Sequence, residues 1–173
     1  SIVESVAADV GQDGATTTPA QTLYDIVRKL PDGAQVEMAE EPDGRLLVRA
    51  GRSQFHLPCL DRQDFPITDQ GDLPSRFDIE AQALRRLIQK TRFAVSTEET
   101  RYYLNGIYLH TADVDGVAVL RAVATDGHRL AQVDMPRPEG AAGIPGVIVP
   151  RKVVNELYRL IEDLDGTVTV SLS

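Results

Sequence analysis

The sequence predicts an α+β fold made of repeated strand–helix–three-strand units, with antiparallel sheets and the helices on one face. Three observations lead to this fold class. Three segments share the apolar spacing of an amphipathic helix, an extended apolar stretch precedes each of them, and period-two strand patterns follow them. The length of 173 residues suits one ordinary domain or two small ones.

The three helical segments align from their first residues, at 19–30, 80–91 and 150–161. Apolar side chains recur at the i, i+3 and i+4 positions of each segment, which is the spacing of one buried helix face. Pro19 and Pro150 suit the first turn of a helix, where the missing N–H leaves no hydrogen bond unmade. We expect the buried faces to include Leu23, Ile26, Leu84, Leu87, Val154 and Leu157.

Strand patterns surround the helices. Extended apolar stretches precede them at 2–10, 76–79 and 146–149. Alternation of apolar and polar side chains is typical of half-buried antiparallel strands. This alternation follows the first helix at 35–38, 45–50 and 54–57, and the second helix at 101–112, 117–125 and 129–135. The turn residues between these strands include Pro42-Asp43-Gly44, Gly51, Asp115-Gly116 and Asp126-Gly127.

The third copy of the repeat is incomplete. Only one strand, at 167–172, follows its helix. A lone strand would leave an unpaired edge, which is an aggregation liability. We therefore expect the chain to be a piece of a longer protein. The stretch 59–75 is rich in Pro, Gly and Asp, as domain linkers are, and places a domain boundary near residue 72.

The composition excludes several classes of protein. The single cysteine, Cys59, rules out an internal disulfide and a cysteine-based zinc cluster, and we expect no metal and no cofactor. No window reaches the roughly 18 consecutive apolar residues of a membrane span. The start of the chain lacks the features of a signal peptide, so a cytoplasmic protein is expected.

The charge distribution points to the helices. The net charge of −8 argues against a uniformly basic nucleic-acid binder. The second helix nevertheless carries Arg85, Arg86 and Lys90 away from its apolar face, and the third begins with Arg151 and Lys152. This pattern fits either an ordinary solvated helix surface or a surface that faces phosphates without reading bases.

Catalytic motifs have little support. The sequence has no Gly-rich phosphate loop, no HExxH and no Gly-x-Ser-x-Gly elbow. His128 and Asp126 could serve a small hydrolase or transferase at a hairpin mouth, or they could lie in a plain hairpin tip or a recognition pocket. Tyr102 and Tyr103 could be core aromatics or a stacking surface for unpaired bases.

Three further motifs stand out: Arg101-Tyr-Tyr-Leu-Asn-Gly106, Ala124-Thr-Asp-Gly-His-Arg-Leu130 and Val147-Ile-Val-Pro-Arg-Lys152. Together they resemble motifs of the bacterial DNA polymerase III beta subunit, the beta sliding clamp family. The resemblance implies a non-catalytic processivity subunit of a DNA-directed DNA polymerase, which is a nucleotidyltransferase. It also implies a closed homodimeric ring around duplex DNA. Residues 1–72 look like the C-terminal half of the first of three domains plus a linker. Residues 73–173 look like the middle domain, truncated at its C-terminus.

The resemblance also implies roles for particular residues. A pocket for peptides of DNA polymerase III subunits, the clamp loader and other proteins with a clamp-binding motif would comprise Leu104, Thr125, Gly127, His128, Arg129 and Leu130. Tyr102 and Tyr103 match a loop that contacts DNA, and with the helix cations they complete a DNA-facing set of Arg85, Arg86, Lys90, Tyr102, Tyr103, Arg151 and Lys152. Glu98 stands where the family often has glutamine, and the hairpin at 112–116 looks longer than usual.

Overall fold

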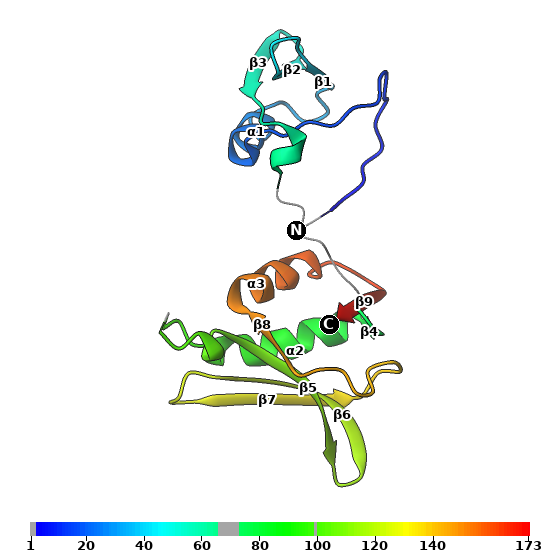
Figure 1. Cartoon of the computed structure of the whole chain (residues 1–173), viewed down its shortest axis with the longest axis vertical. Helices are drawn as coiled ribbons and strands as arrows, with labels where there is room; N and C mark the ends of the chain where they lie inside the picture. Colours follow the sequence, from blue (N-terminus) through cyan, green and yellow to red (C-terminus); the bar gives the residue numbers. More distant parts are fainter. Residues whose placement is uncertain (1–2, 66–72, 99) are drawn as a thin grey trace. The chain divides into compact units, whose positions relative to one another are not determined.

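The computed structural model describes residues 3–65, 73–98 and 100–173 (Figure 1). The chain divides into two compact units, residues 1–69 and residues 70–173. The boundary expected near residue 72 lies outside the described residues. Unit 1 has one sheet and unit 2 has two, and each unit has its own buried core, so each is described by itself.

Unit 1 is a helix packed on a three-stranded antiparallel sheet. The helix is α1 (Ala20–Val27), and the sheet has the order β1 (Val36–Glu40), β2 (Arg45–Ala50) and β3 (Ser53–Pro58). All three strands lie within two residues of their predicted bounds.

Helix α1 ends earlier than the predicted 19–30. After Val27 the chain tightens, because Lys29 and Leu30 donate their N–H groups to carbonyls three residues back at 3.1 and 3.0 Å. Pro31 follows directly, and a proline disfavours the α conformation of the residue before it.

The core of unit 1 is small. Leu46, Val48 and Leu57 are buried, and the half-buried Leu23 and Ile26 of α1 pack against them. The prediction that these two α1 residues would be buried is therefore wrong. One short helix covers only part of a sheet face and leaves its own flanks open to water.

The strand predicted at 2–10 is not formed by its described residues, 3–10. Val3, Val6 and Val10 are 89%, 80% and 64% exposed. A strand is stabilised by hydrogen bonds to a neighbouring strand, and no described strand pairs with this stretch. Apolar character alone thus predicted a strand that has no partner here.

Unit 2 contains two sheets and two helices in its described residues. Its elements are β4 (Ser75–Glu80), α2 (Ala81–Thr91), β5 (Gly106–Val114), β6 (Val117–Thr125), β7 (Leu130–Pro136), β8 (Val147–Pro150), α3 (Arg151–Leu160) and β9 (Thr167–Leu172). One sheet has the order β7-β6-β5-β8, and the other pairs β4 with β9; every pairing is antiparallel. The predicted α+β fold with antiparallel sheets is confirmed.

The two repeats of unit 2 exchange their first strands. β4 precedes α2 but pairs with β9, which follows α3, as in the Phe77–Val170 pair. β8 precedes α3 but pairs with β5, which follows α2, as in the Tyr108–Ile148 pair. This exchange sets α2 and α3 side by side on one face of the larger sheet (Figure 1).

The helices of unit 2 bury most of the side chains that the periodicity selected. Leu84, Leu87 and Val154 are at most 8% exposed, as predicted, whereas Leu157 is only half-buried. Leu120 of β6 is fully buried beneath the two helices. The prediction for Leu157 is wrong, because this residue lies at the margin of the cluster rather than within it.

The turns follow their predicted chemistry. Asp115 and Gly116 join β5 to β6 with positive φ angles of 53° and 80°, the geometry of a type I′ hairpin turn. The strand predicted at 101–112 begins only at Gly106, because Tyr102–Leu104 forms a 3-10 turn, η3. A run of bulky apolar residues is compatible with either structure, so the pattern alone did not separate them.

Candidate nucleic-acid and peptide interfaces

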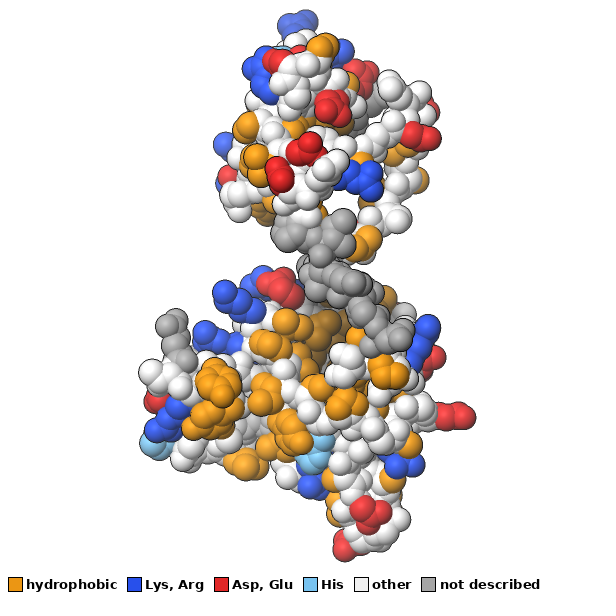
Figure 2. All heavy atoms as spheres, in the orientation of Figure 1, with side chains coloured by type: hydrophobic (Ala, Val, Ile, Leu, Met, Phe, Trp, Pro, Cys, Tyr) orange, Lys and Arg blue, Asp and Glu red, His pale blue; other side chains and the backbone are white. Residues whose placement is uncertain are grey.

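Helix α2 presents a polar, cationic side opposite its buried face. Arg86, Gln89 and Lys90 are exposed there. They border an open hollow of about 610 Å³ that Gln82 and Arg85 also line. Figure 2 shows several Lys and Arg side chains, with an acidic one among them, over the part of unit 2 where α3 lies, and Asp and Glu side chains at the tip of the β5–β6 hairpin. The helical side of unit 2 is therefore locally cationic in an acidic chain.

The start of α3 lies beside the tyrosine turn. Arg151 donates its backbone N–H to the carbonyl of Asn105 at 2.8 Å, and Gly106 pairs with Pro150. Tyr102 and Tyr103 are 79% and 55% exposed, with their rings 5.6 Å apart in an edge-on arrangement. They are not core aromatics.

Six predicted residues are thus exposed on elements that lie next to one another. We call them the basic face, and they are Arg86, Lys90, Tyr102, Tyr103, Arg151 and Lys152. Cations and exposed rings of this kind suit contact with phosphates and sugars rather than with base edges.

Arg85 differs from the basic face. Its guanidinium donates to the Glu162 carbonyl at 2.8 Å and to the Glu162 carboxylate at 3.0 Å, and its side chain is 27% exposed. The structure therefore ties this predicted DNA-facing cation to an acidic partner in its own unit.

The turn that joins β6 to β7 is held by its own side chains, and together with the strand ends Thr125 and Leu130 we call it the hairpin tip, residues 125–130. The Thr125 hydroxyl donates to the Arg129 carbonyl at 2.7 Å and accepts from the Gly127 N–H at 3.1 Å. One oxygen of Asp126 accepts from the N–H groups of His128 and Arg129, both at 3.0 Å. Its other oxygen accepts from the Arg129 guanidinium at 2.9 Å.

These donors lower the pKa of Asp126 to about 2. The main causes are the backbone hydrogen bonds from His128 and then from Arg129, which stabilise the ionised carboxylate. A carboxylate with so low a pKa is a poor general base near neutral pH. Asp126 fixes the shape of the turn, so the structure does not support a hydrolase or transferase built on Asp126 and His128.

The pKa of Asp126 gives a prediction for stability against pH. Its folded pKa of about 2 lies below the ordinary value of 3.8, so its ionisation stabilises the fold above pH 3.8 and this contribution disappears as the pH falls through 2. Asp126→Asn keeps a side-chain oxygen for the turn but removes the charge. The difference in unfolding free energy between wild type and Asp126→Asn should shrink as the pH falls from 5 toward 2, in chemical-denaturation curves at each pH. A difference that stays constant over this range would show that the carboxylate is not ionised in the fold as described.

Leu104, the remaining residue of the predicted peptide pocket, lies at the same end of the sheet as the hairpin tip. Tyr108 pairs with Val123, so the start of β5 and the end of β6 are neighbours, and Leu104 just precedes β5. Leu130 is 64% exposed. The structure thus brings the predicted pocket residues together at one end of unit 2.

Two residues that sequence reasoning missed border the hairpin tip. The Arg129 guanidinium lies 5.7 Å from the centre of the Phe93 ring, and Phe93 is 56% exposed. A Cβ atom on Gly127, whose φ is 92°, would lie 3.2 Å from the guanidinium of Arg101. Phe93 lies two residues after the end of α2, and its only signal in the sequence was a large apolar side chain outside the periodic face.

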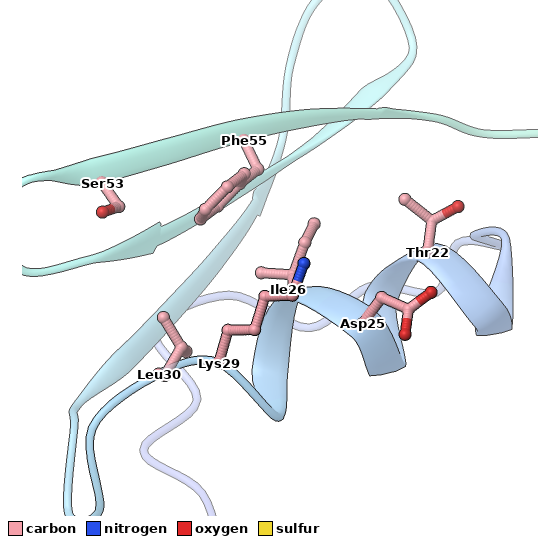
Figure 3. Close-up of a pocket in the computed structure, with 7 residues that line it drawn as sticks. All are labelled: Thr22, Asp25, Ile26, Lys29, Leu30, Ser53 and Phe55. Carbon is pink, nitrogen blue, oxygen red and sulfur yellow. The ribbon is translucent and has the colours of Figure 1, made fainter.

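Unit 1 has a separate hollow of about 310 Å³ between α1 and β3 (Figure 3). Its lining residues are Thr22, Asp25, Ile26, Lys29, Leu30, Ser53 and Phe55. None of them belongs to a predicted site. Among the described residues, no group of three or more His, Cys, Asp or Glu side chains is placed to hold a metal ion. No described helix is long and apolar enough to cross a membrane.

Comparison with protein families gives two matches. Residues 1–69 match the family model of the DNA polymerase III beta subunit, N-terminal domain, and residues 78–173 match that of the central domain. A beta sliding clamp from Caulobacter vibrioides is 55% identical over 173 residues, which is 99% of this chain and 46% of that protein. The Escherichia coli beta sliding clamp is 41% identical over 161 residues, covering 93% of this chain and 42% of that protein.

Solved structures agree with these matches. The polymerase III beta structure from Caulobacter crescentus superposes with a TM-score of 0.89 at 56% identity, over 95% of this chain and 45% of that one. A sliding clamp from Bartonella birtlesii bound to griselimycin gives a TM-score of 0.92 at 49% identity, over 97% of this chain and 45% of that one. The chain spans about half the length of the curated relatives it matches.

Proposed function

Because this chain belongs to the DNA polymerase III beta subunit family, we propose that it is part of a sliding clamp, a ring that encloses duplex DNA and tethers the replicative polymerase. The observation that carries the proposal is the basic face, where exposed cations and tyrosines lie together on the helical side of unit 2. Such a surface binds phosphates whatever the base sequence. A ring holds DNA by enclosure, so weak and sequence-independent contacts suffice and allow sliding.

The whole subunit is proposed to be a non-catalytic, cytoplasmic processivity factor that acts as a homodimeric ring. Residues 1–72 are assigned to the C-terminal half of its first domain with a linker, and residues 73–173 to most of its middle domain. The family matches to the N-terminal and central domains support this assignment.

The hairpin tip with Leu104 is proposed to bind peptides of polymerase subunits, the clamp loader and other partners. Exposed Leu130 offers an apolar contact, and the turn polar groups fix its surroundings. A few polar groups around an apolar surface suit a peptide with hydrophobic anchors. The third domain would complete the pocket, so this chain should bind such a peptide more weakly than the whole subunit does.

Glu98→Gln tests the placement of DNA on the basic face. The Glu98 carboxylate lies 3.3 Å from the Arg101 guanidinium, next to Tyr102. Removal of the carboxylate leaves the Arg101 guanidinium without this partner, so affinity for duplex DNA should rise a few-fold at low salt. The slope of log K against log salt should steepen by up to about 0.9. Fluorescence anisotropy with a labelled linear duplex measures both quantities.

Asp134→Asn is the matched control. It makes the same change of charge in the same unit, but it frees Arg121, whose neighbours in β6, Leu120 and Ala122, point to the helical side. Arg121 therefore lies on the opposite face of the sheet. Equal gains in DNA affinity from both variants would contradict the proposed position of the DNA.

A further inference from the structure

The ring of Tyr158 lies between two arginines at the seam of α2 and α3. The guanidinium of Arg92 is 3.9 Å from the ring centre, and that of Arg85 is 5.3 Å from it. Both distances fall within the range of a cation–π contact. Tyr158 is half-buried and belongs to α3, whereas both arginines come from α2 and the residue that caps its C-terminus.

Arg85 is already neutralised by an acidic side chain. Arg85 donates two hydrogen bonds to Glu162, and Gln82 on the preceding turn of α2 donates to the Leu164 carbonyl at 3.3 Å. These contacts fasten the segment that follows α3 to α2. A cation that is paired with a carboxylate would have to leave that partner to neutralise a phosphate, so it adds little to the release of counterions from DNA.

Arg92 is held differently. Arg92 is exposed, and no ion pair joins it to any acidic side chain among the described residues. The central carbon of its guanidinium lies over the Tyr158 ring, 3.9 Å from the ring centre. Among the described residues no hydrogen bond uses its N–H donors, so they remain for an outside acceptor. A planar fork of this kind binds a phosphate with two parallel hydrogen bonds.

We propose that Tyr158 is a positioning residue that holds Arg92 as a phosphate-binding fork, and that Arg85 anchors the two helices without contacting DNA. This inference rests on the proposed function and refines it. Arg92 joins Arg86 and Lys90 as a phosphate ligand, and Arg85 leaves the set that the sequence predicted.

The test compares the affinity of Tyr158 and arginine variants for a labelled linear duplex across a salt series. Tyr158→Phe keeps the ring and should bind as wild type does. Tyr158→Leu changes no charge at neutral pH and should bind roughly 2- to 5-fold more weakly. Arg92→Gln should lower the salt slope by about 0.9. The charge-neutral double variant Arg85→Gln/Glu162→Gln should leave the slope unchanged and lower the melting temperature.

A double-mutant cycle separates positioning from a general structural effect. If Tyr158 acts through Arg92, then Tyr158→Leu has no further effect on DNA affinity in an Arg92→Gln background. An equal loss in both backgrounds overturns the inference, and so does an unchanged salt slope in Arg92→Gln.

Arg86→Gln and Lys90→Gln distinguish this failure from failure of the proposed function. If both lower the salt slope while Arg92→Gln does not, only the role of Tyr158 and Arg92 is wrong. If none of the three changes the slope, the helical side does not contact DNA and the proposed function also fails.

Discussion

Gly127→Val in the whole subunit is expected to weaken the binding of a clamp-binding peptide by roughly tenfold or more. Gly127 has a φ of 92°, and a β-branched residue held there is strained by about 1–3 kcal/mol. Its new Cβ would also press on Arg101, 3.2 Å away. The hairpin tip must shift to relieve both effects, and the pocket residues shift with it. Titration of a fluorescent peptide from the replicative polymerase measures the loss.

Gly116→Val is the matched control, because it imposes similar strain at the other end of β6. Gly116 has a φ of 80° and open space around it. The Gly116→Val variant should have a lower melting temperature than wild type and the same peptide affinity. Leu104→Ala should weaken peptide binding without altering any turn. If Gly127→Val and Leu104→Ala both bind peptide as wild type does, the pocket lies elsewhere.

Removal of the four cations of the basic face is expected to have the largest effect on DNA binding. The variant replaces with glutamine the residues Arg86, Lys90, Arg151 and Lys152. If each binds one phosphate, the slope of log K against log salt should fall by about 3.6 in total, at about 0.9 for each contact. Duplex binding by this chain should then be lost at physiological salt. Anisotropy titrations over a salt series measure the slope.

A second variant with the same change of net charge provides the control. It replaces with glutamine the residues Arg45, Arg49, Arg52 and Arg121, none of which belongs to the basic face. DNA binding should fall far less, because the local contacts remain. An equal loss from both variants would mean that net charge alone, rather than the basic face, governs binding.

The periodic parts of the fold could be predicted from the sequence because their signals are local. The strands at 45–50, 117–125 and 167–172 match their predicted bounds, and the Asp115-Gly116 turn has the φ angles that its residues favour. Each of these features depends on residues within one strand or one turn.

Features that depend on distant partners were missed. Residues 3–10 have the apolar character of a strand but pair with no described strand. The ion pair between Arg85 and Glu162 joins residues 77 positions apart, and Tyr158 meets Arg92 only because α2 and α3 lie side by side. The sequence identified a cationic helix side, but only the packing of α3 separates the paired Arg85 from the arginines that have no acidic partner among the described residues.

The central claim is that the helical side of unit 2 contacts DNA through phosphates and not through bases. The most direct measurement is the affinity of this chain for two linear duplexes of unrelated sequence over a range of salt concentrations. We expect weak binding that is equal for both duplexes and falls steeply as salt rises, because only a few phosphate contacts are made. Tight binding that persists at high salt, or a strong preference for one sequence, would contradict it.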